Sequence, residues 1–169
     1  MTNKSILIAE SGSSKTDWCL LESGKKILDF KTQGFNPNTQ TFKEIQNQLL
    51  KELLPKIHNK HIHELYFYGA GFSNRSYNSR MKNIFQQILL AQTIEVNHDI
   101  LAAARSTCGK EKGIVCILGT GSNSCLYDGE TIIKIIGGHG FILGDEGSGS
   151  YIGKKIVNEL TNIDIVIYH

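Results

Sequence analysis

The sequence predicts an α/β protein, in which a mixed sheet with the element order βββαβαβα is followed by the start of a second, similar domain. Three observations carry this prediction. Three short apolar segments separated by tight turns open the chain. Segments with helical spacing then alternate with strand-like segments, and near residue 112 the strand–turn–strand pattern begins again. This order fits a mostly parallel sheet that helices cover and that has an antiparallel edge.

The first three strands are expected at residues 5–9, 16–22 and 25–32. The turn ESGSS follows the first strand and a Ser-Gly turn follows the second, so the three strands form an antiparallel meander. After the loop GFNPN, apolar residues at helical spacing predict a helix that Pro55 ends. These residues are Phe42, Ile45, Leu49, Leu50, Leu53 and Leu54.

The pattern then alternates between strands and helices. ELYFYGAG at 64–71 and TIEVNHD at 93–99 read as strands, and apolar residues between 81 and 89 mark an amphipathic helix between them. A short helical stretch, ILAAARS, follows the second of these strands. We place the first domain at residues 1–111 and the second at residues 112–169.

The second domain opens like the first. GIVCILG, SCLYDG and TIIKII read as strands, and a glycine-rich segment, GGHGFILGDEGSGS, leads into a helix that carries Ile152, Ile156 and Leu160. The last segment, TNIDIVIYH, is strand-like. Because so short a stretch supplies a fraction of a domain's core, we expect the second domain to be truncated.

Composition narrows the class of protein. In 169 residues, 40% are hydrophobic and 20% are charged, which is typical of a soluble globular chain. A net charge of +2 without a basic run argues against a nucleic-acid partner, and no apolar stretch is long enough to span a membrane. Four cysteines without a CxxC pair, at 19, 108, 116 and 125, indicate reduced thiols in a cytoplasmic protein.

The turn after the first strand, ESGSSKT at 10–16, is the first candidate site. A Walker loop needs glycines where Ala9 and Ser14 stand, and it leads into a helix, whereas here a strand follows. Two interpretations remain. The turn is an ordinary polar hairpin, or it presents amides and hydroxyls to phosphate while Glu10 holds Mg²⁺ through water. In the second case the phosphate contacts are Gly12, Ser13, Ser14 and Thr16.

Three further segments carry polar groups at strand ends. GTGSN at 119–123 is either another hairpin turn or a source of donors and acceptors, from Thr120, Ser122 and Asn123, for a polyhydroxy ligand. Asp99 is either a helix N-cap or a general base. In GGHGFILGDEGSGS, the density of glycine favours a functional loop, in which Asp145 binds sugar hydroxyls.

Together these segments resemble the N-acetylglucosamine kinase branch of the sugar kinase, actin and heat-shock ATPase superfamily, and in particular its bacterial BadF/BadG-type ATPases. ESGSSKTDW is similar to the first phosphate loop of that family and GFNPN to its sugar-contact loop. NHDILAAARS resembles its catalytic-aspartate segment. GTGSN and GGHGFILGDEGS resemble its sugar and hinge motifs. The resemblance covers the chain to about residue 160.

The resemblance implies a ribonuclease-H-like fold and a kinase that uses ATP and Mg²⁺. Asp99 would deprotonate the 6-hydroxyl of N-acetylglucosamine or glucosamine, and Glu10 would stand at the magnesium position. The implied nucleotide contacts are Gly12, Ser13, Ser14, Lys15 and Thr16. The implied sugar contacts are Asn36, Asp99, Thr120, Gly121, Asn123, Gly138, His139 and Asp145. Positioning and charge neutralisation are the main demands of phosphoryl transfer.

Two residues depart from the family pattern. Glu10 occupies a place that Asp often fills, and His139 stands where relatives carry an aromatic residue. The second phosphate loop and the adenosine pocket are missing, so we expect the chain alone to bind ATP weakly and to turn over little.

Two alternative functions stay open. One is an ATPase activator of a 2-hydroxyacyl-CoA dehydratase-type enzyme, whose iron–sulfur cluster would use cysteines such as Cys108, Cys116 and Cys125 at a dimer interface. The other is a sugar-binding regulatory pseudoenzyme. The expected partner is a small sugar, with neither nucleic acid nor membrane, and a homodimer is left open.

Overall fold

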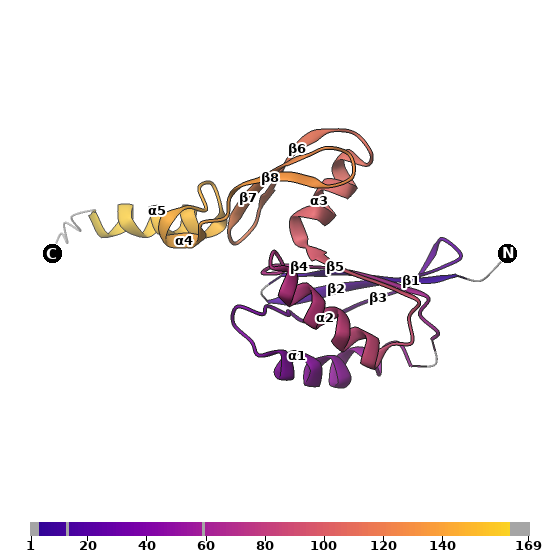
Figure 1. Cartoon of the computed structure of the whole chain (residues 1–169). Coiled ribbons are helices and arrows are strands. Elements are labelled where there is room, and N and C mark those ends of the chain that lie inside the picture. Colours follow the sequence, from indigo (N-terminus) through magenta and orange to yellow (C-terminus); the bar gives the residue numbers. More distant parts are fainter. Residues whose placement is uncertain (1–3, 13, 59, 163–169) are drawn as a thin grey trace. The chain divides into compact units, whose positions relative to one another are not determined.

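The computed structural model describes residues 4–12, 14–58 and 60–162 (Figure 1). The chain divides into two compact units, residues 1–102 (unit 1) and residues 103–169 (unit 2). Helix α3 (Asp99–Cys108) runs through this division. The domain boundary expected between residues 111 and 112 therefore stays a prediction.

Unit 1 contains a five-stranded mixed sheet in the order β3-β2-β1-β4-β5. Strands β1 (Ser5–Ser11), β2 (Lys15–Glu22) and β3 (Lys25–Gln33) form an antiparallel meander. Strands β4 (Glu64–Gly69) and β5 (Thr93–His98) continue the sheet in parallel with β1. The predicted parallel sheet with an antiparallel edge is confirmed.

Helices cover one face of this sheet, and α1 and α2 lie on the same side of it (Figure 1). Helix α1 (Phe42–Gln48) begins at Thr41, whose hydroxyl and backbone exchange hydrogen bonds with Glu44 in a capping box. It continues without a break into a π-helix, η1 (Leu49–Leu53). Helix α2 (Arg75–Ile88) begins six residues before the first apolar marker of the predicted helix, because the side chain of Asn74 caps it.

The core lies between the sheet and these helices. Alternate residues of the central strands face it, so Leu7 and Ala9 of β1 are fully buried beside Trp18 and Leu20 of β2. The Trp18 ring stacks on Phe30 at a centroid distance of 5.9 Å, and its Nε1–H donates a 2.8 Å hydrogen bond to Thr32 Oγ1. The core therefore fixes the strand ends that carry the candidate site.

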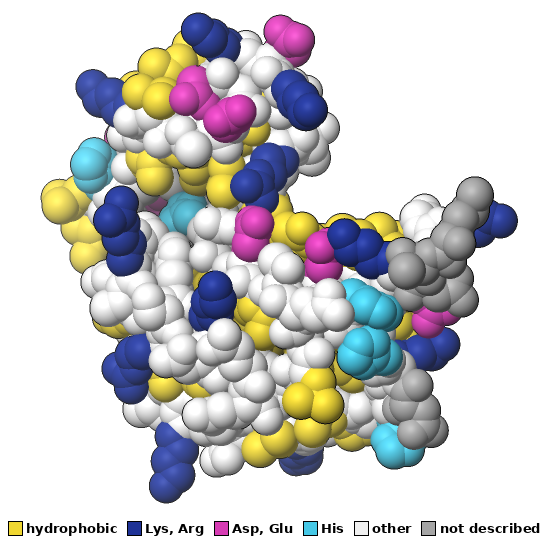
Figure 2. Space-filling model, turned by 45° about the vertical axis from the view of Figure 1, so that its right-hand side comes forward, with side chains coloured by type: hydrophobic (Ala, Val, Ile, Leu, Met, Phe, Trp, Pro, Cys, Tyr) yellow, Lys and Arg dark blue, Asp and Glu magenta, His cyan; other side chains and the backbone are white. Residues whose placement is uncertain are grey.

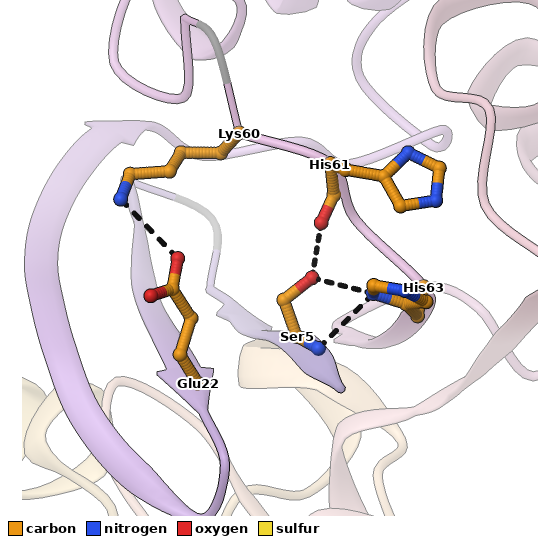
Figure 3. A network of polar contacts seen from close by, with 5 residues as sticks. All are labelled: Ser5, Glu22, Lys60, His61 and His63. Atoms are coloured by element: carbon orange, nitrogen blue, oxygen red, sulfur yellow. Dashed lines mark hydrogen bonds and ion pairs between the residues drawn. The ribbon is translucent and has the colours of Figure 1, made fainter. Parts of the chain in front are cut away.

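A small polar network holds the start of β1 (Figure 3). The backbone N–H of Ser5 donates to His63 Nδ1 at 3.1 Å, and the Ser5 hydroxyl donates to the carbonyl oxygen of His61. Nearby, Lys60 pairs with Glu22 at 3.2 Å. The histidines of this segment thus serve to anchor the first strand.

Unit 2 contains a three-stranded antiparallel sheet in the order β6-β7-β8. Its strands are β6 (Gly113–Leu118), β7 (Ser122–Tyr127) and β8 (Ile132–Gly137). A single helical turn, α4 (Gly140–Leu143), precedes α5 (Gly149–Asn162). The strand expected at the end of the chain lies outside the described residues from residue 163 onward, and its first two residues end α5.

Among the described residues, no helix is both long and apolar enough to cross a membrane.

Candidate functional site

The β1–β2 hairpin forms the turn that the sequence predicts as a phosphate loop. Gly12 N–H donates to the carbonyl oxygen of Lys15 at 2.9 Å and closes the hairpin. Ser14 and Lys15 are exposed beyond it, and Ser13 lies outside the described residues. A strand follows the turn, as expected, so the Walker-loop geometry is absent from this part of the described chain.

Ser11, which was not among the predicted site residues, ties the hairpin to its surroundings. Its buried hydroxyl oxygen accepts hydrogen bonds from Phe35 N–H at 2.9 Å and from Thr16 Oγ1 at 2.8 Å. Its carbonyl oxygen accepts from Ala70 N–H at 2.8 Å. Thr16 is fully buried here, and the nucleotide contact predicted for it stays a prediction.

The carboxyl end of β1 carries a surplus of negative charge. Partial burial raises the pKa of Glu10, and the nearby carboxylates of Asp99 and Asp17 raise it further, while Lys15 opposes them. Like charges that crowd a carboxylate favour a cation beside it. This donor chemistry suits Mg²⁺, which prefers carboxylate oxygens and keeps several of its waters.

Two lysines at the hairpin, Lys15 and Lys31, pair with the same carboxylate, that of Asp17. Asp17 lies 2.7 Å from Lys15 Nζ and 3.4 Å from Lys31 Nζ. Hydrogen bonding to Lys15, and then to Lys31, lowers the pKa of Asp17. All three side chains are substantially exposed, so this pairing orients the lysines more than it stabilises the fold.

Asp99 is the first residue of α3, directly after β5. Its Oδ1 accepts a 2.8 Å hydrogen bond from Ile100 N–H and lies 2.7 Å from His98 Nδ1. The Asp99 side chain is 24% exposed, so solvent reaches the carboxylate. Asp99 therefore has the features of a helix-start residue and keeps the accessibility that a general base needs.

The GFNPN loop is built around Asn36. Its Oδ1 accepts from Asn38 N–H at 2.9 Å, and its carbonyl oxygen accepts from Thr39 and Gln40 N–H. The neighbouring loop approaches closely at Gly71, where a Cβ atom would lie 2.7 Å from Asn36 Oδ1. The Asn36 side chain is thus held in one orientation, and the sugar contact at Asn36 stays a prediction.

In unit 2, Asp145 organises the GTGSN loop. Its buried carboxylate accepts a 3.1 Å hydrogen bond from Ser122 N–H, and a Cβ atom at Gly121 would lie 3.0 Å from Asp145 Oδ2. The first amides of α5 also bind the loop, because Gly149 N–H donates to the Gly119 carbonyl and Ser150 N–H to the Thr120 carbonyl. We predicted from the sequence that Asp145 contacts a sugar, and this stays a prediction. In the structure Asp145 contacts the GTGSN loop.

The remaining predicted residues of unit 2 lie around Asn123. The Asn123 Oδ1 accepts from Ser124 N–H at 2.9 Å, and a Cβ atom at Gly138 would lie 3.3 Å from Asn123 Nδ2. His139 lies directly before α4, and its side chain makes no capping hydrogen bond. Thr120 is exposed. Gly121, Asn123, Gly138 and Asp145 are therefore brought together within unit 2.

The structure gathers the predicted residues into two groups, one in each unit. Glu10, Gly12, Lys15 and Asp99 belong to unit 1 with Asn36, and the GTGSN and glycine-rich segments belong to unit 2. Sequence reasoning missed Ser11 and His98. The alternation of β1 places Ser11 on the same buried face as Leu7 and Ala9, and a polar residue on a buried face requires a hydrogen-bond partner.

Within the described ranges, no group of three or more His, Cys, Asp or Glu side chains could hold a metal ion. Cys125 is buried and Cys116 is exposed, and Cys19 and Cys108 are intermediate. The described cysteines therefore form no cluster site within this chain.

A model of the BadF/BadG/BcrA/BcrD ATPase family matches residues 10–161. No curated protein matched the chain. Among solved structures, the chain is similar to a proposed N-acetylglucosamine kinase from Porphyromonas gingivalis, with 45% identity and a TM-score of 0.88. That match covers 92% of this chain and 56% of the other.

Two more distant structures share the fold. A proposed N-acetylglucosamine kinase from Chromobacterium violaceum has 18% identity and a TM-score of 0.69, over 92% of this chain and 56% of the other. The ROK hexokinase from Thermus thermophilus has 10% identity and a TM-score of 0.55, over 85% of this chain and 50% of the other. The predicted ribonuclease-H-like, actin-like ATPase fold is confirmed. The chain spans about half the length of these solved relatives.

Proposed function

Because the chain belongs to the BadF/BadG/BcrA/BcrD ATPase family, we propose that it is the lobe of an ATP-dependent kinase that phosphorylates the 6-hydroxyl of N-acetylglucosamine or glucosamine. One observation carries the proposal. A solvent-accessible carboxylate, Asp99, lies within electrostatic range of a carboxylate-rich phosphate hairpin, in a chain that is 45% identical to a proposed N-acetylglucosamine kinase.

The hairpin of unit 1 would bind the nucleotide phosphates. The exposed turn offers backbone N–H groups and the Lys15 ammonium, which Asp17 orients. Glu10 would hold Mg²⁺, which when bound would neutralise charge on the transferring phosphoryl group. The raised pKa of Glu10 means that cation binding competes with protonation, so ATP·Mg²⁺ binding strengthens as Glu10 ionises.

Asp99 would accept the proton of the attacking sugar hydroxyl. Its Oδ1 accepts the hydrogen bond from Ile100 N–H and lies 2.7 Å from His98 Nδ1. One carboxylate oxygen would thus fix the side chain while the other faces the substrate. His98 would act as a positioning residue, because its Nδ1 lies 2.7 Å from the anchored oxygen.

Unit 2 would supply sugar recognition. Asp145, Asn123 and Thr120 offer acceptors and donors at the ends of strands, which suits a polyhydroxy ligand. Gly121 and Gly138 let these side chains approach the backbone closely. Asn36 would add a further sugar contact. The whole activity is proposed for the two-lobed protein, and we expect the chain alone to turn over little.

The proposal is tested by single-turnover transfer of labelled γ-phosphate to a panel of hexosamines at high protein concentration. We expect slow transfer that N-acetylglucosamine or glucosamine stimulates and that Asp99→Asn abolishes. The substitution keeps a side chain that can cap α3, so ATP binding, measured by titration calorimetry, should persist. Full transfer by Asp99→Asn, or ADP release that no sugar stimulates, would contradict the assignment.

A further inference from the structure

Strand β5 forms one edge of the unit 1 sheet. It pairs in parallel with β4 on one side, and among the described strands it has no neighbour on its other side. A strand at the edge of a sheet presents backbone N–H and C=O groups with which another extended chain can pair. The outer side of β5 can therefore accept a further strand.

The two edges of this sheet differ in charge. The opposite edge, β3, carries Lys25, Lys26 and Lys31, and lysines on an edge strand oppose pairing with another chain. Strand β5 has the sequence TIEVNH, which contains no lysine and one acidic residue, Glu95. Of the two edges, β5 is the one whose sequence permits an added strand.

A pocket of about 260 Å³ lies between α2 and this edge. Asn78, Ser79 and Lys82 of α2 form one wall, and the consecutive residues 94–97 of β5 form the other. Consecutive residues point to opposite faces of a strand, so a pocket that touches all four lies beside the strand's edge. No described residue of β4 lines the pocket, which places it at the outer edge of β5.

Asn78 brings to this pocket an acceptor that lacks a donor. Its Oδ1 is shielded from solvent and has no hydrogen-bond partner among the described residues. Buried polar atoms are nearly always paired in folded proteins, so an exception of this kind requires an explanation. Because Asn78 lines the pocket, its side chain can turn toward a donor placed there, such as the N–H of a peptide.

The α2 wall of the pocket is cationic. Helix α2 contains Arg75, Arg80 and Lys82 and neither Asp nor Glu. Arg80 lies over the Phe42 ring, 4.2 Å from its centroid, whereas Lys82 is exposed at the pocket. Within the described ranges Lys82 has no ion pair. Several Lys and Arg side chains lie apart from any Asp or Glu side chain on the face that Figure 2 shows. A carboxylate is the group that complements Lys82.

We propose that the pocket and the outer edge of β5 bind an extended, acidic segment of another protein. The segment pairs with β5 as a sixth strand of the sheet. An Asp or Glu side chain on its α2 side pairs with Lys82, and the alternate side chains lie toward Glu95, where neutral residues avoid repulsion. The site lies outside the residues assigned to nucleotide and sugar, so this inference goes beyond the proposed kinase function.

The test measures the binding of a short fluorescent peptide to the 169-residue chain by fluorescence anisotropy. The probe alternates acidic and β-branched residues, Thr-Glu-Val-Glu-Thr-Glu-Val-Glu-Thr with blocked ends, and a second peptide carries lysine in place of each glutamate. We expect saturable binding of the acidic peptide and none of the lysine peptide. On binding, the backbone amides of β5 should gain protection from hydrogen exchange, and those of β3 should not.

Charge reversal locates the site. Lys82→Glu should weaken binding of the acidic peptide about tenfold, because it replaces an attraction by a repulsion, and it should allow the lysine peptide to bind. Lys56→Glu makes the same change of charge at an exposed residue outside the pocket, so it is the matched control. It should change the Kd less than about twofold, since solvent and salt screen a distant charge.

A second pair of variants tests the unpaired acceptor. Asn78→Leu removes the oxygen that lacks a donor, so it should raise the melting temperature while weakening binding of the acidic peptide about threefold. Asn83→Leu makes the same substitution at an exposed position of α2. It should raise the melting temperature less than Asn78→Leu does and should leave the Kd unchanged.

Four results would each overturn the proposal. The acidic peptide fails to saturate the chain at millimolar concentration. Lys82→Glu and Lys56→Glu bind it equally well. The gain in protection from exchange falls on β3 or on unit 2 instead of β5. The chain without peptide forms a dimer that Lys82→Glu dissociates, which would assign the edge of β5 to a second copy.

Discussion

The hydroxyl oxygen of Ser11 lies 2.9 Å from the backbone nitrogen of Phe35 and accepts its hydrogen bond. Through this contact the end of β1, which opens the phosphate hairpin, is joined to the loop that carries Asn36. The same oxygen accepts from Thr16. One buried hydroxyl therefore sets the relative positions of a predicted nucleotide loop and a predicted sugar loop.

Replacing Ser11 by alanine removes this acceptor while the donors stay buried. An unpaired buried N–H costs roughly 1–3 kcal/mol, and Ser11→Ala should lower the free energy of unfolding by that amount. Urea denaturation followed by tryptophan fluorescence measures it. Ser14→Ala in the exposed turn is the control and should leave stability unchanged. Equal stabilities of the two variants would show that Ser11 is not the anchor.

Glu10 predicts a pH dependence of stability. Its pKa is raised above the ordinary 4.5 by partial burial and by Asp99 and Asp17, so the folded state binds the proton more tightly than the unfolded state does. The stability that protonated Glu10 contributes is therefore lost as pH rises from about 4.5 through the raised pKa. Glu10→Gln should be increasingly more stable than the wild type across that window, with a constant difference above it.

The control for this prediction has the opposite sign. Hydrogen bonds from the Thr41 backbone and side chain lower the pKa of Glu44, so its contribution is present at neutral pH and lost as pH falls through the lowered pKa. Thermal melts of the wild type, Glu10→Gln and Glu44→Gln at several pH values between 3 and 7 provide the comparison. A pH-independent difference for Glu10→Gln would contradict a raised pKa of Glu10 in the folded state.

Trp18 gives a direct optical test of the core. Its indole N–H donates to Thr32 Oγ1 at 2.8 Å, and both side chains are buried. Thr32→Val keeps the shape and leaves the indole N–H without its acceptor, which should cost about 1–3 kcal/mol and shift the emission of this single tryptophan. Thr93→Val, at an exposed position of the same sheet, should change neither. An unaltered spectrum in Thr32→Val would count against the hydrogen bond.

The sequence predicted unit 1 well, because its strands alternate and its helices bury one face. Leu7 and Ala9, or Ile45 and Leu49, show this periodicity directly. Helix α2 was predicted too short, since its first turns are polar and the cap at Asn74 carries the start signal. The π-helical segment after α1 has the same apolar spacing as an α-helix and could not be distinguished from one.

The sequence motifs of the candidate site could be recognised, but the hydrogen bonds that join its segments could not be predicted. Glycine and carboxylate patterns indicated Glu10, Asp99 and Asp145 as candidates. A hydrogen bond such as that between Ser11 and Phe35 joins residues far apart in the sequence, and no local pattern indicates it. Burial in unit 2 could not be predicted either. The spacing of Ile152 and Ile156 indicates an apolar helix face, but whether that face is covered depends on what packs against it.

Gly71 offers a way to disturb the Asn36 loop from outside. Its φ is +82°, and a Cβ atom there would lie 2.7 Å from Asn36 Oδ1 and 2.9 Å from Asn38 Nδ2. Gly71→Ala therefore combines left-handed strain of about 1–2 kcal/mol with a steric clash. Gly24→Ala is the matched control, because φ is +77° there and a Cβ atom would meet nothing within 4 Å.

Both variants should lose stability in urea, and Gly71→Ala should lose more. Gly71→Ala should also weaken N-acetylglucosamine binding measured by calorimetry, whereas Gly24→Ala should not. Equal losses of stability in the two variants would mean that the Asn36 loop moves aside freely, and would remove the support for a preformed sugar contact at Asn36.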